Sequence, residues 1–135
     1  MTISEWMVFA AVVLYLLTLA PVKVFGYRNF DNSNPRAPSF YKSGIASRAL
    51  GAHLNGIEVF PFFAIAILLA EFRHQPQNVI DTLSIGFIGV RIAFVLAYLG
   101  NRPTTRTVLW NVGFVVNSAI FFAPLWSLHY RSLFP

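Results

Sequence analysis

The chain of 135 residues is unusually apolar, with 56% hydrophobic residues, 11% charged residues and a mean hydropathy of +0.61. Soluble domains usually carry about 25% charged residues, so this chain has too few polar groups to cover a water-facing surface. The composition therefore argues against a soluble enzyme, a nucleic-acid-binding module and a disordered tail. It predicts an integral membrane protein whose basic residues, ten Lys and Arg against five Asp and Glu, lie mostly between apolar runs and face anionic lipid headgroups.

Four apolar segments are long enough to cross a membrane as helices, which takes roughly 20 residues each. They occupy residues 6–24, 49–70, 79–99 and 107–126. A helix satisfies its backbone hydrogen bonds internally in lipid, whereas a lone strand does not. We therefore predict an all-α fold, an integral membrane four-helix bundle that forms one domain over residues 1–135.

The connections between these segments predict the orientation. Residues 25–48 are rich in Asn, Ser, Pro and Gly and read as a long loop, whereas 71–78 and 101–104 read as short turns. The side shared by the first and third connections carries seven basic residues: Lys23, Arg28, Arg36, Lys42, Arg48, Arg102 and Arg106. The other side carries Arg73 and Arg131. The positive-inside rule places the seven in the cytoplasm and both termini outside it, an arrangement compatible with a bacterial inner membrane.

Two opposite charges fall inside the predicted spans. Glu58 and Arg91 each lie roughly 12–15 Å below the predicted cytoplasmic surface at about 1.5 Å per residue. An isolated charge at this depth costs on the order of 2.5–3.5 kcal/mol on insertion scales. We therefore predict a Glu58–Arg91 ion pair that faces the bundle interior, either as part of a site or as structural glue between helices.

Polar residues recur on one face of three predicted helices. These faces comprise Arg48, Gly51, Asn55, Glu58 and Phe62; then Ser84, Arg91 and Tyr98; and then Arg106, Trp110, Gly113 and Asn117. Each residue alone has a structural reading, such as helix packing or an arginine that extends to the membrane surface. Three converging faces instead predict a polar cleft open to the cytoplasm. His53 points away from the Asn55–Glu58 face, so we expect it to meet a loop or another subunit.

The residue types in this cleft restrict its chemistry. No His or carboxylate pattern has metal-ligand spacing, so no metal site is predicted. The sequence has neither a glycine-rich phosphate loop nor a GxSxG nucleophile motif. The cationic and hydrogen-bonding groups that remain are suited to holding an anion and stabilising negative charge.

Two stretches resemble signatures of the MAPEG family, the membrane-associated proteins of eicosanoid and glutathione metabolism. RALGAHLNGIE, from Arg48 to Glu58, and the following FPF at 60–62 resemble the second helix of that family. RIAFVLAYLG from Arg91 and RTVLW from Arg106 resemble its third and fourth helices. The resemblance implies a homotrimer with an active site between neighbouring subunits, which binds glutathione and acts on lipophilic small molecules.

The resemblance also implies roles for individual residues. Arg106 stands at the family's catalytic arginine, where a guanidinium beside the thiol favours the nucleophilic thiolate. The implied glutathione-binding positions are Lys23, Arg48, Asn55, Glu58, Arg91, Tyr98, Thr107 and Trp110. Lys23 replaces a first-helix arginine, Thr107 replaces a serine, and Trp110 stands where a tyrosine is common.

Three departures from the family pattern keep two functions open. Gly51 and Leu54 stand where eicosanoid-pathway members carry arginines for the glutathione carboxylates, and Phe94 stands where some members have histidine. The first hypothesis is a membrane-bound glutathione-dependent transferase or peroxidase acting on small lipophilic electrophiles or lipid hydroperoxides. The alternative is a non-catalytic trimeric membrane scaffold or lipid-binding protein that keeps the fold after losing the cofactor site.

Overall fold

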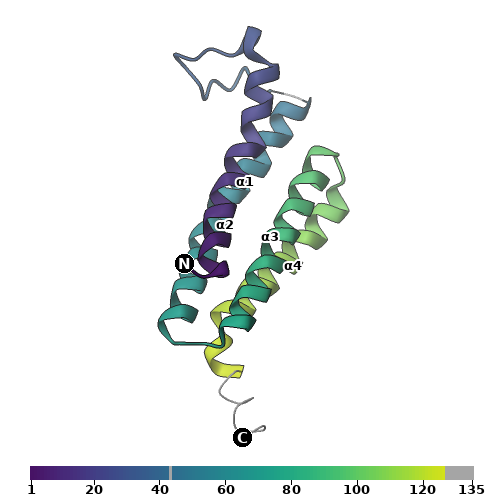
Figure 1. The fold of residues 1–135 in the computed structure, drawn as a ribbon. Coiled ribbons are helices and arrows are strands. Elements are labelled where there is room, and N and C mark those ends of the chain that lie inside the picture. The colour runs from purple at the N-terminus through teal and green to yellow at the C-terminus, as the bar shows by residue number, and fades with distance from the viewer. Residues whose placement is uncertain (43, 127–135) are drawn as a thin grey trace, which may run out of the picture.

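The computed structural model describes residues 1–42 and 44–126, and four long helices make up most of this part of the chain (Figure 1). They are α1 (Ile3–Phe25), α2 (Gly44–Phe72), α3 (Gln77–Leu99) and α4 (Pro103–Phe121), with a short 3₁₀ turn, η1 (Tyr27–Asn29), after α1. No strand occurs within the described residues. The all-helical prediction is therefore confirmed, while the part of the predicted domain at residues 127–135 lies outside the described residues.

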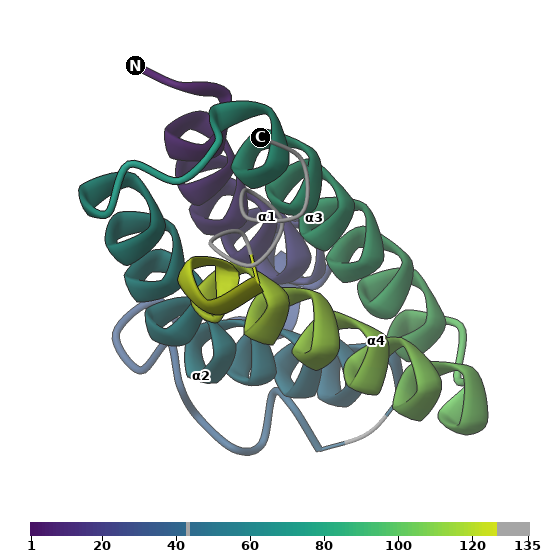
Figure 2. The ribbon, with the colours of Figure 1, turned by 90° about the horizontal axis from the view of Figure 1, so that it is seen from below.

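Successive helices run in opposite directions along the bundle (Figures 1 and 2). The central helices, α2 and α3, each contact all three of the others, and α1 and α4 flank them. The long α1–α2 loop and the α3–α4 turn therefore lie at one end, and the α2–α3 turn lies at the other with the N-terminus (Figure 1). This arrangement brings α2, α3 and α4 together where the predicted polar faces meet.

Three of the helices, α1, α2 and α3, are long and apolar enough to cross a membrane. The fourth helix does not meet the same standard, because polar residues such as Thr105, Asn111 and Asn117 interrupt its apolar side chains. Three membrane-length helices thus support the prediction of a membrane protein. The fourth membrane span stays a prediction.

The helix ends differ most from the predicted spans at the start of α2 and at the end of α4. α2 begins at Gly44, whose φ of 66° suits a glycine, so the long loop ends earlier than predicted. α4 ends at Phe121 and not at Trp126. Pro124 lies just beyond this end and has no amide hydrogen to donate to the carbonyl of Ile120.

Aromatic rings and small residues fill the space between the helices. Phe63 of α2 stacks on Phe87 of α3 with ring centroids 4.2 Å apart, and both side chains are fully buried. Gly56 of α2 has no side chain where the Tyr15 ring of α1 lies, and a Cβ there would overlap that ring. The glycine therefore allows α1 and α2 to approach closely.

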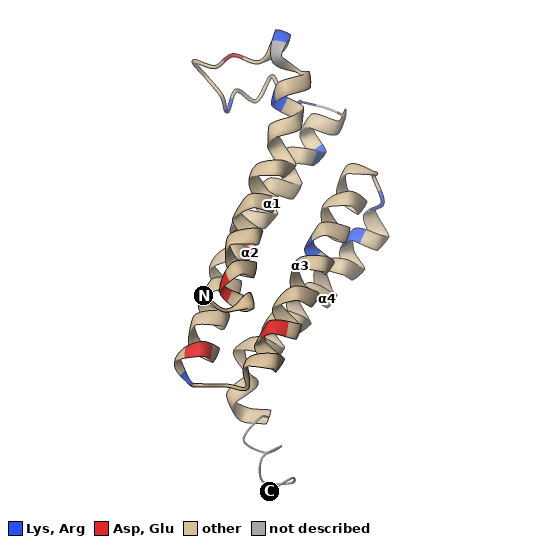
Figure 3. Cartoon of the chain, viewed as in Figure 1, with Lys and Arg blue, Asp and Glu red and all other residues tan. Residues whose placement is uncertain are grey.

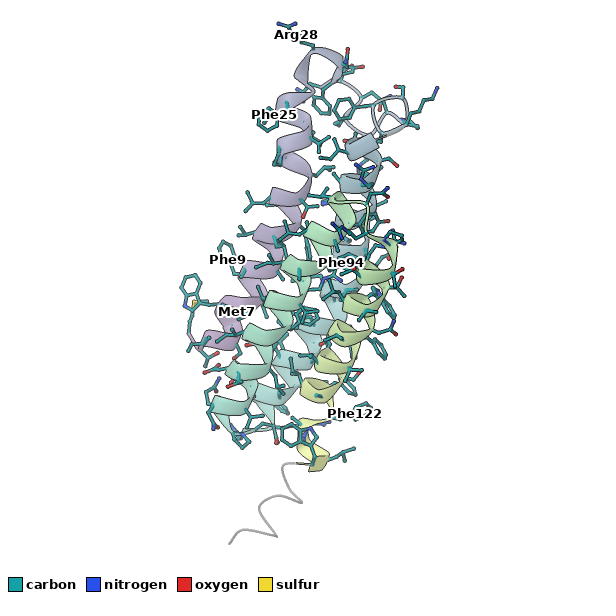
Figure 4. The ribbon with its side chains drawn as sticks, turned by 90° about the vertical axis from the view of Figure 1, so that its right-hand side faces the viewer. Met7, Phe9, Phe25, Arg28, Phe94 and Phe122 are labelled. Carbon is teal, nitrogen blue, oxygen red and sulfur yellow. The ribbon has the colours of Figure 1, made fainter. Side chains whose placement is uncertain are left out.

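The outer surface of the bundle carries large apolar side chains. Phe9 and Phe25 point away from the bundle on the outer side of α1, whereas Phe94 lies in its interior (Figure 4). Phe25 is 88% exposed and Phe94 is 2% exposed. An apolar exterior of this kind suits contact with lipid or with another subunit rather than with water.

Charges separate along the bundle (Figure 3). Most Lys and Arg residues lie at the end with the α1–α2 loop and the α3–α4 turn, which we call the basic end, and most Asp and Glu residues lie toward the other end. Asp31, in the α1–α2 loop, is an acidic residue at the basic end. Arg131, which entered the orientation argument, lies outside the described residues. The charge separation matches the pattern behind the predicted orientation, and the orientation itself stays a prediction.

A hydrogen-bond network connects the N-terminus to the α2–α3 turn, at the end of the bundle opposite the basic end. The carboxylate of Glu71 accepts hydrogen bonds from Thr2 Oγ1 at 2.9 Å, Ser4 Oγ at 2.5 Å and Gln77 Nε2 at 3.0 Å. Asp81 accepts from the Ser4 backbone N–H and from Gln77 Nε2, both at 2.9 Å. The network fixes the start of α1 against α2 and α3.

Removing the Glu71 carboxylate should destabilise the bundle. Glu71→Ala removes the acceptor that Thr2, Ser4 and Gln77 share, and each hydrogen bond to a charged group contributes about 1.5–3 kcal/mol. We expect a thermal unfolding midpoint several degrees below that of the wild type in the same lipid nanodiscs. Arg73→Ala, an exposed change two residues away, is the control, and equal shifts in the two variants would contradict the prediction.

Candidate functional site

A cavity of about 430 Å³ lies between α2, α3 and α4 toward the basic end, and we call it the outer cavity. Its lining residues are Gly51, Leu54, Asn55 and Glu58 of α2, Phe94 and Tyr98 of α3, and Arg106, Thr107 and Trp110 of α4. Six of the nine predicted site residues are among them: Asn55, Glu58, Tyr98, Arg106, Thr107 and Trp110. Each of the three predicted polar faces therefore contributes residues to this cavity: Asn55 and Glu58 of α2, Tyr98 of α3, and Arg106 and Trp110 of α4.

Arg106 lies in the first turns of α4, over the side chain of Tyr98. Pro103 begins the helix, where its missing N–H is harmless, and the Arg106 N–H bonds the Arg102 carbonyl at 3.0 Å. The Arg106 guanidinium carbon lies 4.5 Å from the centroid of the Tyr98 ring, a cation–π distance. A half-buried cation near a helix N-terminus, with its positive dipole end, favours an anion at this wall of the cavity.

Tyr98 belongs to a column of groups on one face of α3. Its ring meets the Phe94 ring edge to face at 5.6 Å. The guanidinium of Arg91, one turn further along, lies 4.3 Å from the centroid of the Phe94 ring. The two aromatic rings thus separate a buried cation, Arg91, from the more accessible cation Arg106, and hold both in place.

The predicted ion pair between Glu58 and Arg91 is wrong. Within the described part of α2 and α3 their charged atoms do not come within 4.0 Å, and Arg91 Nη2 instead donates to Asn55 Oδ1 at 2.9 Å. Asn55 precedes Glu58 by three residues, about 4.5 Å along the helix, so the long arginine side chain reaches the amide and not the carboxylate. Glu58 is exposed in the single subunit and borders the outer cavity.

A second cavity, of about 240 Å³, continues from the outer cavity into the bundle, and we call it the inner cavity. It shares Asn55, Glu58 and Trp110 with the outer cavity. Its remaining lining residues are Val59, Phe62, Phe87, Arg91, Gly113, Phe114 and Asn117. Arg91, the seventh predicted site residue, therefore lines the inner cavity and not the outer one.

The last two predicted residues lie apart from both cavities. Arg48 donates from Nε to the carbonyl of Leu99 at 3.0 Å and borders a small space of about 50 Å³ next to Tyr98 and Arg106. Lys23 Nζ lies 5.2 Å from the centroid of the Phe30 ring, beside the α1–α2 loop. Within one subunit, the structure does not bring Lys23 to the outer cavity.

Sequence reasoning missed several residues of the inner cavity and of the small space beside Arg48. Arg102 borders the small space together with Arg48 and Arg106, although the sequence assigned it only to a basic turn; its position four residues before Arg106 was the available signal. Phe87 and Phe114 were read as ordinary apolar span residues, and no sequence signal marks them as lining a cavity. Among residues 1–42 and 44–126, no group of three or more Asp, Glu, His or Cys residues is placed to hold a metal ion.

These features define a helical membrane protein with a cationic, aromatic cavity at its basic end. The sequence model of the MAPEG family matches residues 3–126, and the chain belongs to the MAPEG family. That family includes glutathione-dependent transferases and peroxidases, and its members are generally trimeric. A search among curated proteins returns no match to this chain.

Proposed function

We propose that this protein is a membrane-bound glutathione-dependent transferase or peroxidase that acts on small lipophilic electrophiles or lipid hydroperoxides. The observation that carries the proposal is the position of Arg106, half-buried over Tyr98 in the wall of a cavity that also holds Asn55 and Glu58. Family membership adds that related proteins generally use glutathione.

The proposed chemistry begins with the glutathione thiol. A guanidinium beside the sulfur stabilises the thiolate and lowers the pKa of the thiol, and each unit takes about 1.4 kcal/mol of preferential stabilisation. The thiolate then forms a C–S bond to an electrophilic carbon, and the displaced electron pair leaves with the leaving group or is protonated. In the peroxidase form the thiolate attacks a hydroperoxide oxygen and releases an alcohol, and a second glutathione gives the disulfide and water.

The remaining groups of the site suit the polar parts of the tripeptide. The Asn55 and Thr107 side chains offer hydrogen bonds, and the Glu58 carboxylate suits the ammonium group of glutathione. Arg48 and Arg102 border a small space together with Tyr98 and Arg106, so they offer further cations for the carboxylates of glutathione. In this proposal, these two arginines take over the role of the arginines that eicosanoid-pathway members carry at the positions of Gly51 and Leu54.

We further propose a homotrimer whose sites lie between subunits. Glu58 is exposed in the single subunit although it belongs to a membrane-length helix, and an exposed carboxylate at that depth is costly unless another subunit or a ligand covers it. A neighbouring subunit would also supply the Lys23 that a single subunit leaves apart from the cavity. With the basic end in the cytoplasm, as the positive-inside rule predicts, the cavity opens to the cytoplasm and both termini lie on the other side of the membrane.

Titration of reduced glutathione into the protein in nanodiscs tests the proposal. We expect saturable binding at or below millimolar glutathione, with the ultraviolet absorbance of a thiolate growing in proportion. The oxygen analogue of glutathione, with serine in place of cysteine, is the control and should bind without this absorbance. An absence of saturable binding at millimolar glutathione would overturn the proposal.

The second candidate function is a non-catalytic scaffold or lipid-binding protein, and the cavity wall supplies the observation that favours it. Gly51, Leu54 and Phe94 all line the outer cavity and give it uncharged surface where related enzymes are expected to place cations. Under this alternative, Glu58→Ala weakens the trimer, and Arg106→Ala changes neither assembly nor any measured binding.

A further inference from the structure

The inner cavity has the composition of a binding site for a small apolar molecule. Its walls include the side chains of Val59, Phe62, Phe87 and Phe114, and Trp110 stands where it joins the outer cavity. Trp110 and Phe114 stack in parallel with centroids 5.7 Å apart. At about 240 Å³ the space is smaller than the roughly 300–1,000 Å³ of sites for drug-sized ligands, so it suits one ring with a short chain.

Two buried polar side chains line this apolar space without full hydrogen bonding. Asn117 is 1% exposed, and neither its amide nitrogen nor its amide oxygen has a partner among the described residues. Arg91 is 2% exposed; its Nη2 bonds Asn55, and its Nε has no partner in the described part of the chain. A buried amide left unsatisfied costs about 1–3 kcal/mol, and native proteins rarely leave both atoms of one amide unpaired.

We propose that the inner cavity binds a small lipophilic carbonyl compound. The apolar body of the molecule lies among the phenylalanine rings, and its carbonyl oxygen accepts a hydrogen bond from the Asn117 amide. Asn117 lines this cavity although both its amide atoms are buried, so its side chain rotates toward the ligand as the ligand binds. A ligand acceptor is favoured because two of the three unpaired atoms, the nitrogens of Asn117 and Arg91, are donors.

The position of the cavity gives this ligand a role. The inner and outer cavities share Asn55, Glu58 and Trp110, so a molecule in the inner cavity lies beside the place proposed for glutathione. The identification of this molecule as the lipophilic substrate rests on the proposed function. Its binding does not, and can be measured in the absence of glutathione.

A pair of probes that differ in one oxygen tests the proposal. Benzylacetone is a methyl ketone with a phenyl ring at the end of its chain, and n-butylbenzene has a methylene group in place of the carbonyl. Each is titrated into nanodiscs that carry a Trp6→Phe, Trp126→Phe protein, in which Trp110 is the remaining tryptophan of three and reports binding by fluorescence. Empty nanodiscs correct for partition into lipid. We expect saturable binding of both probes, with the ketone bound more tightly.

Asn117→Leu, which removes the amide at similar volume, should weaken ketone binding about tenfold and leave hydrocarbon binding unchanged. Asn111→Leu is the matched control, because Asn111 is an exposed asparagine of the same helix whose amide bonds the Thr107 carbonyl. Equal ketone affinity in the Asn117 variant and the parent protein would overturn the proposal. So would an equal loss in both asparagine variants.

A second variant covers the case in which Asn117→Leu fails to fold. A Cβ on Gly113 would lie 3.6 Å from Val90 Cγ1, an ordinary contact, so the backbone accepts a side chain here. Because Gly113 lines the inner cavity, Gly113→Leu places the other carbons of the leucine side chain in that cavity. We expect it to abolish binding of both probes, whereas Gly89→Leu, at a glycine that faces open space, should bind as the parent does. Probe binding that survives Gly113→Leu would contradict the proposal. A parent protein that binds the probes but not glutathione would contradict only the proposed function.

Discussion

Arg106→Ala is expected to lower kcat/KM for glutathione conjugation by about 10²–10³, the usual effect of removing one group that stabilises developing negative charge. The guanidinium of Arg106 stands over Tyr98 in the outer cavity, where the proposed thiolate forms. Its removal should also raise the pKa of the bound thiol, so that thiolate absorbance appears at higher pH. Arg106→Lys should fall between the two proteins, because an ammonium keeps the charge and loses the planar contact with the tyrosine ring.

The control for Arg106 removes the same charge elsewhere at the basic end. Arg36→Ala changes an exposed arginine of the α1–α2 loop and should leave turnover and the thiol pKa unchanged. Both variants should keep the oligomeric state of the wild type in native mass spectrometry. An Arg106→Ala protein with the wild-type thiol pKa and turnover would show that this arginine is not the thiolate partner.

Helical periodicity predicted several of the polar residues that line the outer cavity. Asn55, Tyr98 and Arg106 come from three different helices and line one cavity, because residues spaced by three, four or seven share a helix face whatever the details of packing. The same argument could not find Phe87 or Phe114 as cavity residues. An apolar side chain that fills space and one that borders a cavity look alike in sequence.

Hydrogen-bond partners were harder to predict than faces. Matching depth suggested Glu58 for Arg91, and the structure gives Asn55, because a long flexible side chain reaches more than one turn of the neighbouring helix. His53 was expected to meet a loop or another subunit, yet its Nδ1 lies 2.9 Å from the carbonyl oxygen of Tyr15 on α1. The sequence does not reveal how closely α1 approaches α2, which depends on the absence of a side chain at Gly56.

Gly51 should control the position of Tyr98, and hence the shape of the outer cavity. A Cβ on Gly51 would lie 2.5 Å from the Tyr98 hydroxyl oxygen and 2.9 Å from the ring carbon that carries it. Gly51→Ala therefore forces the ring to move and disturbs its contact with Arg106, at a cost of about 1–3 kcal/mol for overpacking. We expect glutathione affinity to fall about tenfold in isothermal titration. The unfolding midpoint should fall even though alanine is the better helix former.

A double-mutant cycle isolates this contact. Gly51→Ala is measured in the wild type and in a Tyr98→Ala background, which lacks the ring that the added methyl group would overlap. The cost of Gly51→Ala should then disappear, giving strong non-additivity between two residues in contact. Gly89→Ala, on the open side of α3, is the matched control and should be neutral or stabilising. Additive effects of Gly51→Ala and Tyr98→Ala would mean that the glycine does not set the position of the tyrosine ring.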